Sequence, residues 1–266
     1  MGSKMNNGII FSICINENDK MESHYLYKQL SYCLESLRKV NKDIDVKVYY
    51  SCKDGLPNNH TEYFPVDAKT EFIPFKNDIS LGWYDTFLDG GFAKVIEHRW
   101  INAFKGLEDF GFDNILYMDT DTQFFRDPEE IFAKYGNSEF IWTREDTCED
   151  LMKALKIYPG MNDGITLVSK NILKHKDLCL TSIKKYINYS LDKYLSILSE
   201  KNHQHLNWVI IQYAAFDYFY QRNLHAYFSK NDILLHVEDK KDTHAVHHYF
   251  TGNSSKFLPK RLGGEQ

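Results

Sequence analysis

Residues 114–125 constrain the fold of this chain more than any other stretch, because an apolar, strand-like run there ends in two closely spaced carboxylates, Asp119 and Asp121. In an extended backbone side chains alternate, so we expect both carboxylates on one face of the strand end. Two adjacent carboxylates repel each other and are costly to bury alone, so a cation is expected beside them. A turn is the alternative, because Asp and Thr often bond the local backbone at strand ends.

Composition indicates a folded protein without a global basic surface. The chain has 266 residues, 43% of them hydrophobic, which is enough to bury one large core. Aromatic residues make up 15% of the chain, which argues against disorder. The formal charge of −5 argues against a nucleic-acid partner bound through a uniformly positive field. We therefore expect one compact domain and no nucleic-acid partner.

The five cysteines indicate a reducing compartment. They are scattered singly, without a C-x-x-C pair, which is typical of free thiols and not of a disulfide framework or zinc site. No stretch approaches the roughly 18 apolar residues of a membrane span, and the N-terminus lacks the apolar core of a signal peptide. These patterns predict a soluble, cytoplasmic protein without a membrane span.

Apolar periodicity predicts alternating strands and helices in the first half of the chain. Residues 8–15 form a nearly continuous apolar run, typical of a fully buried strand. Helical spacing over 23–40 leads into alternation over 44–48 and a short strand at 72–75. A second helical stretch, 92–107, directly precedes the acidic strand. The order strand, helix, strand favours a parallel sheet.

The second half continues this mixture without an internal repeat or linker. Asp127-Pro128 is a typical helix start, with Asp as the N-cap and Pro at the first helical position. Further strands are expected at 139–143, 165–168, 233–237 and 245–250, and further helices at 178–198 and 208–220.

Several stretches of the chain follow a distinctive order. Residues 115–121 read ILYMDTD and are followed by FRDP at 125–128. Residues 162–167 read NDGITL, and residues 247–252 read HHYFTG, with Lys256 beyond them. These stretches resemble, in order, the viYLDaDvlv, NaGvml and HftG..K segments of the glycogenin and lipooligosaccharide galactosyltransferase-like family, which are retaining glycosyltransferases with the GT-A fold.

The resemblance implies both an architecture and an activity. The fold would be α/β: a mixed, mainly parallel, Rossmann-like sheet flanked by helices, with Asp-x-Asp at a strand end. One GT-A domain would span residues 1–266, its nucleotide-binding part at about 8–125 and its acceptor and C-terminal part at about 126–258. The enzyme would be a hexosyl- or pentosyltransferase that moves a sugar from a nucleoside diphosphate donor to a hydroxyl acceptor on a glycan, protein or lipid, with retention.

A divalent cation is part of this expectation. A hard cation with oxygen ligands can bridge the donor's phosphates and stabilise the charge that develops as the glycosidic bond breaks. Asp119 and Asp121 would supply carboxylate oxygens, so Asp119 also counts as a donor-binding residue. A C-terminal histidine would add a nitrogen ligand, which favours Mn²⁺ over Mg²⁺ without deciding between them. The family pattern sets this histidine three residues before the glycine, where Tyr249 stands, so we favour His248 and keep His247 as the alternative.

Five further residues are expected to contact the donor. Lys94 stands in the first turn of the helix before the acidic strand, where the resembled family has a basic residue. Lys256 is a phosphate candidate, and Gly252 would let the backbone approach the diphosphate closely. Asn16 follows the first strand, at the edge of the sheet where nucleotides bind. Asn162 matches a segment that contacts the transferred sugar in the resembled family.

The catalytic carboxylate is left open between two residues. Asp163 replaces a small residue of the family pattern, so it is a base, an acceptor contact or a turn former. Asp146 follows a predicted strand and is the second candidate. Spacing alone does not choose between them.

Two other classes of protein fit part of the pattern. Asp119-Thr120-Asp121-Thr122 satisfies the Asp-x-Asp-x-Thr motif of haloacid-dehalogenase-like phosphatases, with Asp119 as nucleophile. That class also needs a later Gly-Asp motif, and the chain contains no Gly-Asp dipeptide. A catalytically inactive, sugar-binding GT-A protein is the other alternative, although such a protein has no need of both aspartates.

Overall fold

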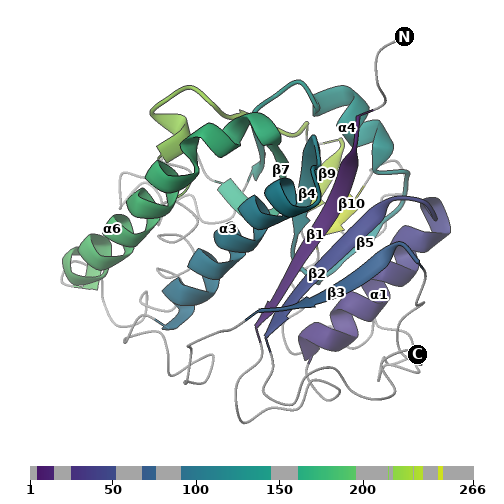
Figure 1. Cartoon of the computed structure of the whole chain (residues 1–266), viewed down its shortest axis with the longest axis horizontal. Coiled ribbons are helices and arrows are strands. Elements are labelled where there is room, and N and C mark those ends of the chain that lie inside the picture. Colours follow the sequence, from purple (N-terminus) through teal and green to yellow (C-terminus); the bar gives the residue numbers. More distant parts are fainter. Residues whose placement is uncertain are drawn as a thin grey trace.

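The structure, a computed structural model, is built around two β-sheets. It describes residues 5–14, 25–51, 68–75, 91–144, 161–195, 215, 218–229, 231–235 and 245–247. Within these residues a seven-stranded sheet has the order β3-β2-β1-β4-β7-β6-β8, and a three-stranded sheet has the order β5-β10-β9. Figure 1 shows the large sheet between helices on its two faces.

The strands are β1 (Asn7–Cys14), β2 (Asp45–Ser51), β3 (Thr70–Pro74), β4 (Asn114–Met118), β5 (Thr122–Phe124), β6 (Phe140–Arg144), β7 (Met161–Ser169), β8 (Ala226–Tyr227), β9 (Ile233–Leu235) and β10 (Ala245–His247). The helices are α1 (Tyr25–Val40), α3 (Gly91–Asp109), α4 (Glu129–Tyr135) and α6 (Lys176–Leu195), with a short 3₁₀ helix, η2 (Lys170–His175).

The first four strands of the large sheet are parallel, as the order of strands and helices predicts. β1 pairs in parallel with both β2 and β4, and β2 pairs in parallel with β3. β7 then pairs antiparallel with β4 and with β6, so the sheet is mixed beyond β4. Because β1 and β4 are parallel neighbours, their carboxyl ends lie at the same edge of the sheet.

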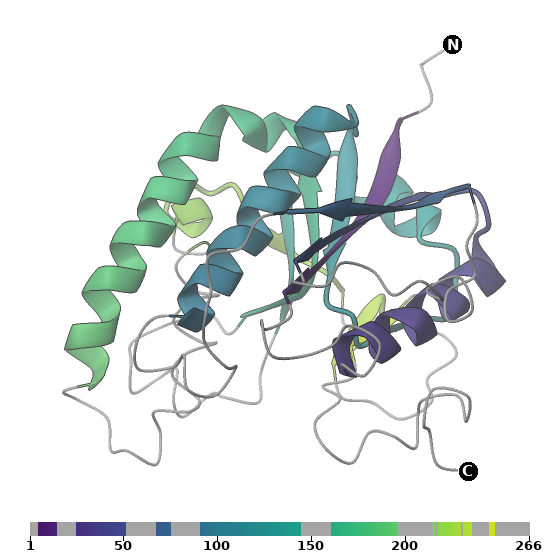
Figure 2. The ribbon, with the colours of Figure 1, turned by 60° about the horizontal axis from the view of Figure 1, so that its bottom comes forward.

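Side chains of β1 alternate between two separate cores. Ile9, Phe11 and Ile13 are fully buried and pack on the face covered by α1. Ile10 faces the opposite side, where Phe104 of α3 packs with it. α3 and α6 lie side by side over this second face in both views (Figures 1 and 2). Burial on both faces explains why the first strand reads as a continuous apolar run.

One glycine sets how closely α3 approaches the sheet. A Cβ atom added to Gly106 would lie 1.8 Å from Cδ1 of Ile10. Since Ile10 is fully buried, any larger residue at position 106 would have to displace Ile10 or the helix. The helix therefore sits on β1 at a distance that only glycine permits without such a displacement.

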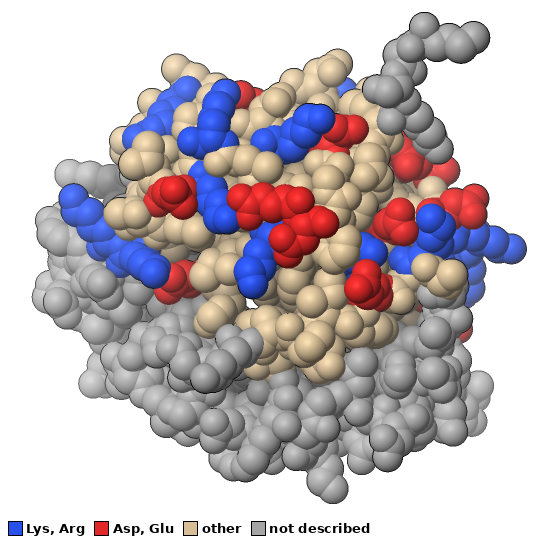
Figure 3. All heavy atoms as spheres, viewed as in Figure 1, with Lys and Arg blue, Asp and Glu red and all other residues tan. Residues whose placement is uncertain are grey.

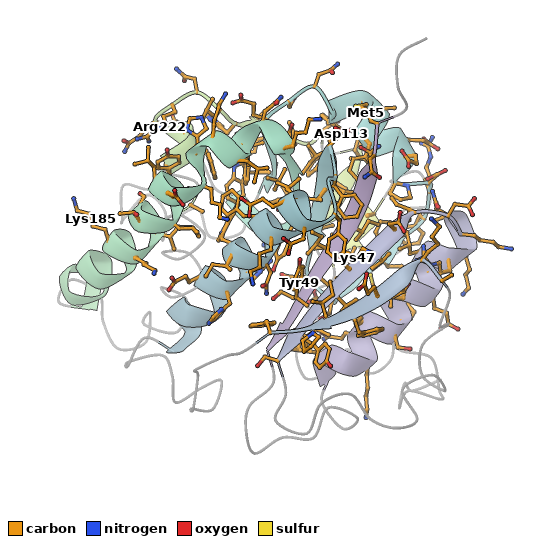
Figure 4. All side chains as sticks on the ribbon, in the orientation of Figure 1. Met5, Lys47, Tyr49, Asp113, Lys185 and Arg222 are labelled. Carbon is orange, nitrogen blue, oxygen red and sulfur yellow. The ribbon has the colours of Figure 1, made fainter. Side chains whose placement is uncertain are left out.

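An ion-paired aspartate, Asp113, stands at the amino end of β4. The carboxylate of Asp113 accepts a hydrogen bond from the backbone N–H of Asn6 at 2.8 Å and pairs with Lys170. Figure 4 shows Asp113 beside Met5, at the end of the sheet where the chain enters it. These contacts tie the first described residues to the loop before β4 and to the end of β7.

The described surface carries no large field of one sign on the face shown in Figure 3, where basic and acidic side chains are interspersed. None of the described helices is long and apolar enough to cross a membrane.

The predicted mainly parallel sheet with flanking helices is confirmed. β8 was not predicted, because two residues are too short to show a periodic pattern. Most of the predicted helix at 208–220 lies outside the described residues, and the division at about residue 125 stays a prediction.

Candidate active site

The acidic pair lies in a turn between the two sheets. β4 ends at Met118, Thr120 and Asp121 form a turn, and β5 begins at Thr122. The pair thus follows a strand end as predicted, and of the two local conformations that the sequence left open the structure has the turn, because the chain leaves the large sheet here to enter the small one. Asp119 and Asp121 are nevertheless both half-buried, while Thr120 between them is buried at 4% exposure. The two carboxylates thus stay accessible from solvent.

A buried arginine pairs with the first carboxylate. Nη2 of Arg99, on α3, lies 2.8 Å from Oδ1 of Asp119. The arginine side chain is 11% exposed and the aspartate side chain 32%. The cation expected beside the carboxylates is therefore, for Asp119, a side chain of the protein itself. Sequence reasoning missed Arg99 and placed the basic residue of this helix at Lys94.

Arg99 is held in place by Tyr117, which stands two residues before Asp119. Nε of Arg99 donates to the Tyr117 hydroxyl at 3.2 Å, and its guanidinium lies 5.1 Å from the centre of the tyrosine ring. The hydroxyl also hydrogen-bonds Ser12, whose Oγ accepts from Nδ2 of Asn102 at 2.9 Å. Burial raises the pKa of Tyr117, so its hydroxyl stays neutral. A polar chain therefore connects α3 and β1 to the acidic turn.

Helix α1 supports the same turn from the other face of the sheet with a polar stripe. The stripe consists of Gln29, Cys33 and Ser36. Their spacing of four and three residues puts them on one side of the helix. Thr120 Oγ1 donates to Gln29 Oε1 at 3.0 Å, and the backbone N–H of Phe124 donates to Ser36 Oγ at 3.0 Å.

Cys33 completes this stripe. Its sulfur accepts a hydrogen bond from the backbone N–H of Thr122. Burial raises the pKa of the Cys33 thiol, and the nearby Asp121 carboxylate raises it further. The thiol is therefore protonated and structural, and it is no nucleophile. The stripe thus binds alternate residues of the acidic turn and β5, at positions 120, 122 and 124.

The segment at residues 162–164 adjoins the backbone of Asp119. The backbone N–H of Asp119 donates to the carbonyl of Gly164 at 2.7 Å, and the N–H of Gly164 donates to Oδ1 of Asn162 at 2.8 Å. The pairing of β6 with β7 shifts register between Trp142 and Thr143, which lets this segment bulge beside the turn. Asn162 is fully buried, so its side-chain oxygen shapes the loop that borders Asp119.

β10, the last described strand, lies beside β5, the strand that follows the acidic turn. β10 pairs antiparallel with β5, and this register puts His247 opposite Thr122, the residue that follows Asp121. Thr122 is fully buried, and its Oγ1 has no hydrogen-bond partner among the described residues. Chain segments separated by more than a hundred residues thus meet at one turn.

The structure describes only some of the residues that the sequence analysis selected. The backbone is described for Lys94, in the first turn of α3, for Asp163, within β7, and for His247, within β10. The predicted residues outside the described part of the chain are Asn16, Asp146, His248, Gly252 and Lys256.

The described donor set suits a hard divalent cation but is incomplete. Asp119 and Asp121 offer carboxylate oxygens of the kind that Mn²⁺ and Mg²⁺ accept. Among the described residues there is no group of three or more His, Cys, Asp or Glu side chains placed to hold a metal ion.

Comparison with known proteins identifies the fold. The sequence matches no family model and no curated protein. The structure is similar to mouse xyloside xylosyltransferase 1 in its apo form, with a TM-score of 0.54 and 11% identity over 91% of this chain and 98% of that one. It is also similar to the glycosyltransferase GlyE of Streptococcus pneumoniae TIGR4, with a TM-score of 0.53 and 12% identity over 94% of this chain and 56% of that one.

A third similar structure was solved with metal and nucleotide. Core-mannan synthase A of Aspergillus fumigatus, in its Mn/GDP form, matches with a TM-score of 0.50 and 8% identity over 85% of this chain and 73% of that one. The identities are low, so these matches describe the fold and not the substrates. The chain has the GT-A fold of glycosyltransferases, as the order of its sequence segments predicts.

Proposed function

We propose that this protein is a metal-dependent glycosyltransferase that moves a sugar from a nucleoside diphosphate sugar to a hydroxyl group of a glycan, protein or lipid. The observation that carries the proposal is the meeting of three distant segments at the acidic turn. The carbonyl of Gly164 accepts a hydrogen bond from the backbone N–H of Asp119, and His247 lies opposite Thr122 in the pairing of β10 with β5. These are the three segments whose order resembles the glycogenin-like family, so their proximity in space supports a common site.

The residues at the turn match what a sugar nucleotide needs. Asp119 and Asp121 would hold Mn²⁺ or Mg²⁺, with His248 or His247 as a further ligand. The bound cation would stabilise the charge of the departing diphosphate. The Mn/GDP form of core-mannan synthase A, which shares this fold, supports such a combination of metal and nucleotide.

The remaining assignments concern donor and acceptor. Asn16, Lys94, Gly252 and Lys256 would contact the nucleotide or its phosphates. Asn162 would border the transferred sugar, since its loop adjoins Asp119.

Two carboxylates are the proposed candidates for the acceptor side. Asp163 lies in β7, in the segment that borders Asp119, and Asp146 follows β6 in sequence. Transfer would occur with retention of anomeric configuration. The acceptor hydroxyl would have to approach from the side of Asp163 if that residue is the base.

A thermal-shift screen of nucleotide sugars, with and without Mn²⁺, tests the proposal most directly. A ligand that binds only the folded protein raises the melting temperature. We expect at least one nucleotide sugar to raise it, and Mn²⁺ to enlarge the shift. If no nucleotide sugar shifts the melting temperature under either condition, the proposed donor class is wrong.

Substitution at the turn tests the metal role. Asp121→Ala should abolish metal-dependent hydrolysis and transfer of the donor, with an unchanged circular dichroism spectrum. Asp43→Ala is the matched control, because Asp43 is an exposed aspartate in the turn before β2. Equal activity of the two variants would refute a metal role for Asp121.

A second pair of variants distinguishes between the two candidate histidine ligands. His247→Ala and His248→Ala should differ in Mn²⁺ affinity, and the one that leaves this affinity unchanged is not the ligand. Loss of affinity in neither variant would remove both histidines from the metal site.

The same assays distinguish the two alternative classes. A phosphatase would release phosphate from simple phosphomonoesters and ignore sugar nucleotides. An inactive sugar-binding protein would show the thermal shift without hydrolysis or transfer.

A further inference from the structure

Arg99 carries a permanent positive charge that the fold holds against the acidic turn. Its Nη2 lies 2.8 Å from Oδ1 of Asp119, its Nε donates to the Tyr117 hydroxyl, and only 11% of its side chain is exposed. An arginine does not lose its proton in a protein. One carboxylate oxygen of Asp119 is therefore already paired with the Arg99 guanidinium before any cation binds.

The arginine has little freedom to leave this position. Its partner Tyr117 is 5% exposed and hydrogen-bonds Ser12, which in turn accepts from Asn102. Asn102 stands three residues after Arg99 on α3, so both residues face the same part of the sheet. Moving Arg99 away from Asp119 would require breaking a buried hydrogen bond as well as the ion pair, which is costly.

The pair changes the charge that a divalent cation encounters. Asp119 and Asp121 alone carry two negative charges, and with Arg99 the three described side chains carry one net negative charge. A cation that binds the carboxylates must also lie close to the guanidinium, which repels it. A diphosphate has the opposite preference, since both the guanidinium and the metal attract its oxygens.

We propose that Arg99 is a positioning residue that makes binding of the divalent cation depend on binding of the nucleotide diphosphate. The inference rests on the proposed function, because it takes the acidic turn as the metal site. Metal alone binds weakly against the fixed arginine charge, and the diphosphate supplies the missing negative charge and oxygen ligands. By linkage, the metal strengthens nucleotide binding by the same factor as the nucleotide strengthens metal binding.

Mn²⁺ binding to the whole 266-residue chain without nucleotide tests this inference. Free Mn²⁺ is counted by electron paramagnetic resonance for the wild type, Arg99→Gln and Arg99→Lys. Gln keeps a donor for Tyr117 and removes the charge, whereas Lys keeps the charge. We expect Arg99→Gln to bind Mn²⁺ at least about tenfold more tightly than the wild type, and Arg99→Lys to stay near the wild type.

Two further variants locate the effect. Lys105→Gln removes an exposed charge from the same helix and should leave Mn²⁺ affinity unchanged. Asp121→Ala combined with Arg99→Gln should lose the gain, because the added affinity belongs to the acidic turn.

Melting temperatures of all variants verify folding. If Arg99→Gln does not fold, Tyr117→Phe removes the hydroxyl that holds Arg99 while keeping an aromatic ring, and it should raise Mn²⁺ affinity in the same direction by a smaller factor.

The inference and the proposed function fail in different ways. If a folded Arg99→Gln binds Mn²⁺ no more tightly than the wild type, or Arg99→Lys gains as much as Arg99→Gln, the inference is wrong. Calorimetry with UDP and with GDP should show that Mn²⁺ strengthens nucleotide binding in the wild type and does so less in Arg99→Gln. If neither nucleotide nor any sugar nucleotide binds any variant, the proposed function is wrong, and the metal titration alone still decides the effect of Arg99.

Discussion

The two ends of β4 carry the same kind of contact with different surroundings. Asp113 precedes the strand and pairs with Lys170, and Asp119 follows it and pairs with Arg99. Both residues also bond the backbone of β7 or its flank: the Asp113 carbonyl accepts from the N–H of Lys170 at 2.8 Å, and the Asp119 N–H donates to Gly164 at 2.7 Å. The lysine side chain is 57% exposed, whereas the arginine is 11% exposed.

This difference in exposure distinguishes a hydrated surface ion pair, Asp113–Lys170, from a largely buried one, Asp119–Arg99. A hydrated lysine contributes little by pairing, and its charge is screened by water and salt. A buried arginine with a planar, fixed guanidinium keeps its field within the protein and directs it at one carboxylate. Ion pairing by itself therefore does not mark a functional aspartate, and the burial and immobility of the partner do.

The largest expected contrast between the two ends is in catalysis. Asp119→Asn should reduce glycosyl transfer by about 100-fold or more, because it would remove a charged ligand of the proposed cation, which would stabilise the departing diphosphate. Asp113→Asn should change it by less than about twofold, since a surface pair has only a small effect on the fold. Steady-state rates with the donor found in the thermal-shift screen measure both. Similar losses of activity in the two variants would refute a special role for Asp119.

The next contrast is in stability. Ser36→Ala should lower the free energy of unfolding by about 1–3 kcal/mol, because it leaves the buried N–H of Phe124 without its acceptor. Lys170→Met at the opposite end should cost less than about 1 kcal/mol. Urea unfolding followed by circular dichroism gives both values. If Lys170→Met lowers the free energy of unfolding more than Ser36→Ala does, the amino end of β4 is the more strongly stabilised end.

A smaller effect is expected for the contact between Gln29 and Thr120. A double-mutant cycle with Gln29→Leu and Thr120→Val should give a coupling of about 0.5–1.5 kcal/mol in unfolding free energy, as for one neutral hydrogen bond. Additive effects of the two changes would mean that α1 does not hold the turn through this bond.

The smallest effect concerns pH at the amino end. The hydrogen bond from Lys170, followed by that from Asn6, lowers the pKa of Asp113. A carboxyl group with a lowered folded-state pKa adds stability above its unfolded pKa, near 4, and loses it as the pH falls through the folded value. The stability difference between wild type and Asp113→Asn should therefore shrink as the pH falls below about 4. A difference that is constant with pH would contradict the pairing.

The strands of the large sheet other than β8, and the helices that flank it, were predictable because their burial leaves a pattern in the sequence. Ile9, Ile10, Phe11 and Ile13 are all buried, so β1 reads as an apolar run, and the helical spacing before β4 corresponds to α3. The order of the segments also predicted the GT-A fold, which the comparison with solved structures confirms.

The geometry around the carboxylates was not predictable in the same way. Local sequence offered the turn at Thr120 and Asp121 only as an alternative to an extended strand end, and the change of sheet that accompanies it is a tertiary event. Arg99 carries one weak signal, a charged residue beside Trp100 on the buried face of a helix, where a charge needs a partner. That the partner is Asp119, twenty residues later, depends on how α3 lies on β4.

The register of distant strands was also beyond the sequence. Nothing in residues 245–247 specifies that His247 pairs with Thr122 and not with a neighbouring residue. The roles of Asn162, Asp163 and the histidines stay predictions.

The close approach of Gly106 to Ile10 has a consequence for Arg99, which stands in the middle of the same helix. Arg99 stands seven residues before Gly106, which is about 10 Å along the axis. A single added methyl group at position 106 would press on Ile10 or tilt α3, and a tilt there moves the guanidinium relative to Asp119. Where α3 moves instead of Ile10, a substitution at position 106 therefore also changes the electrostatics of the acidic turn, two helical turns away.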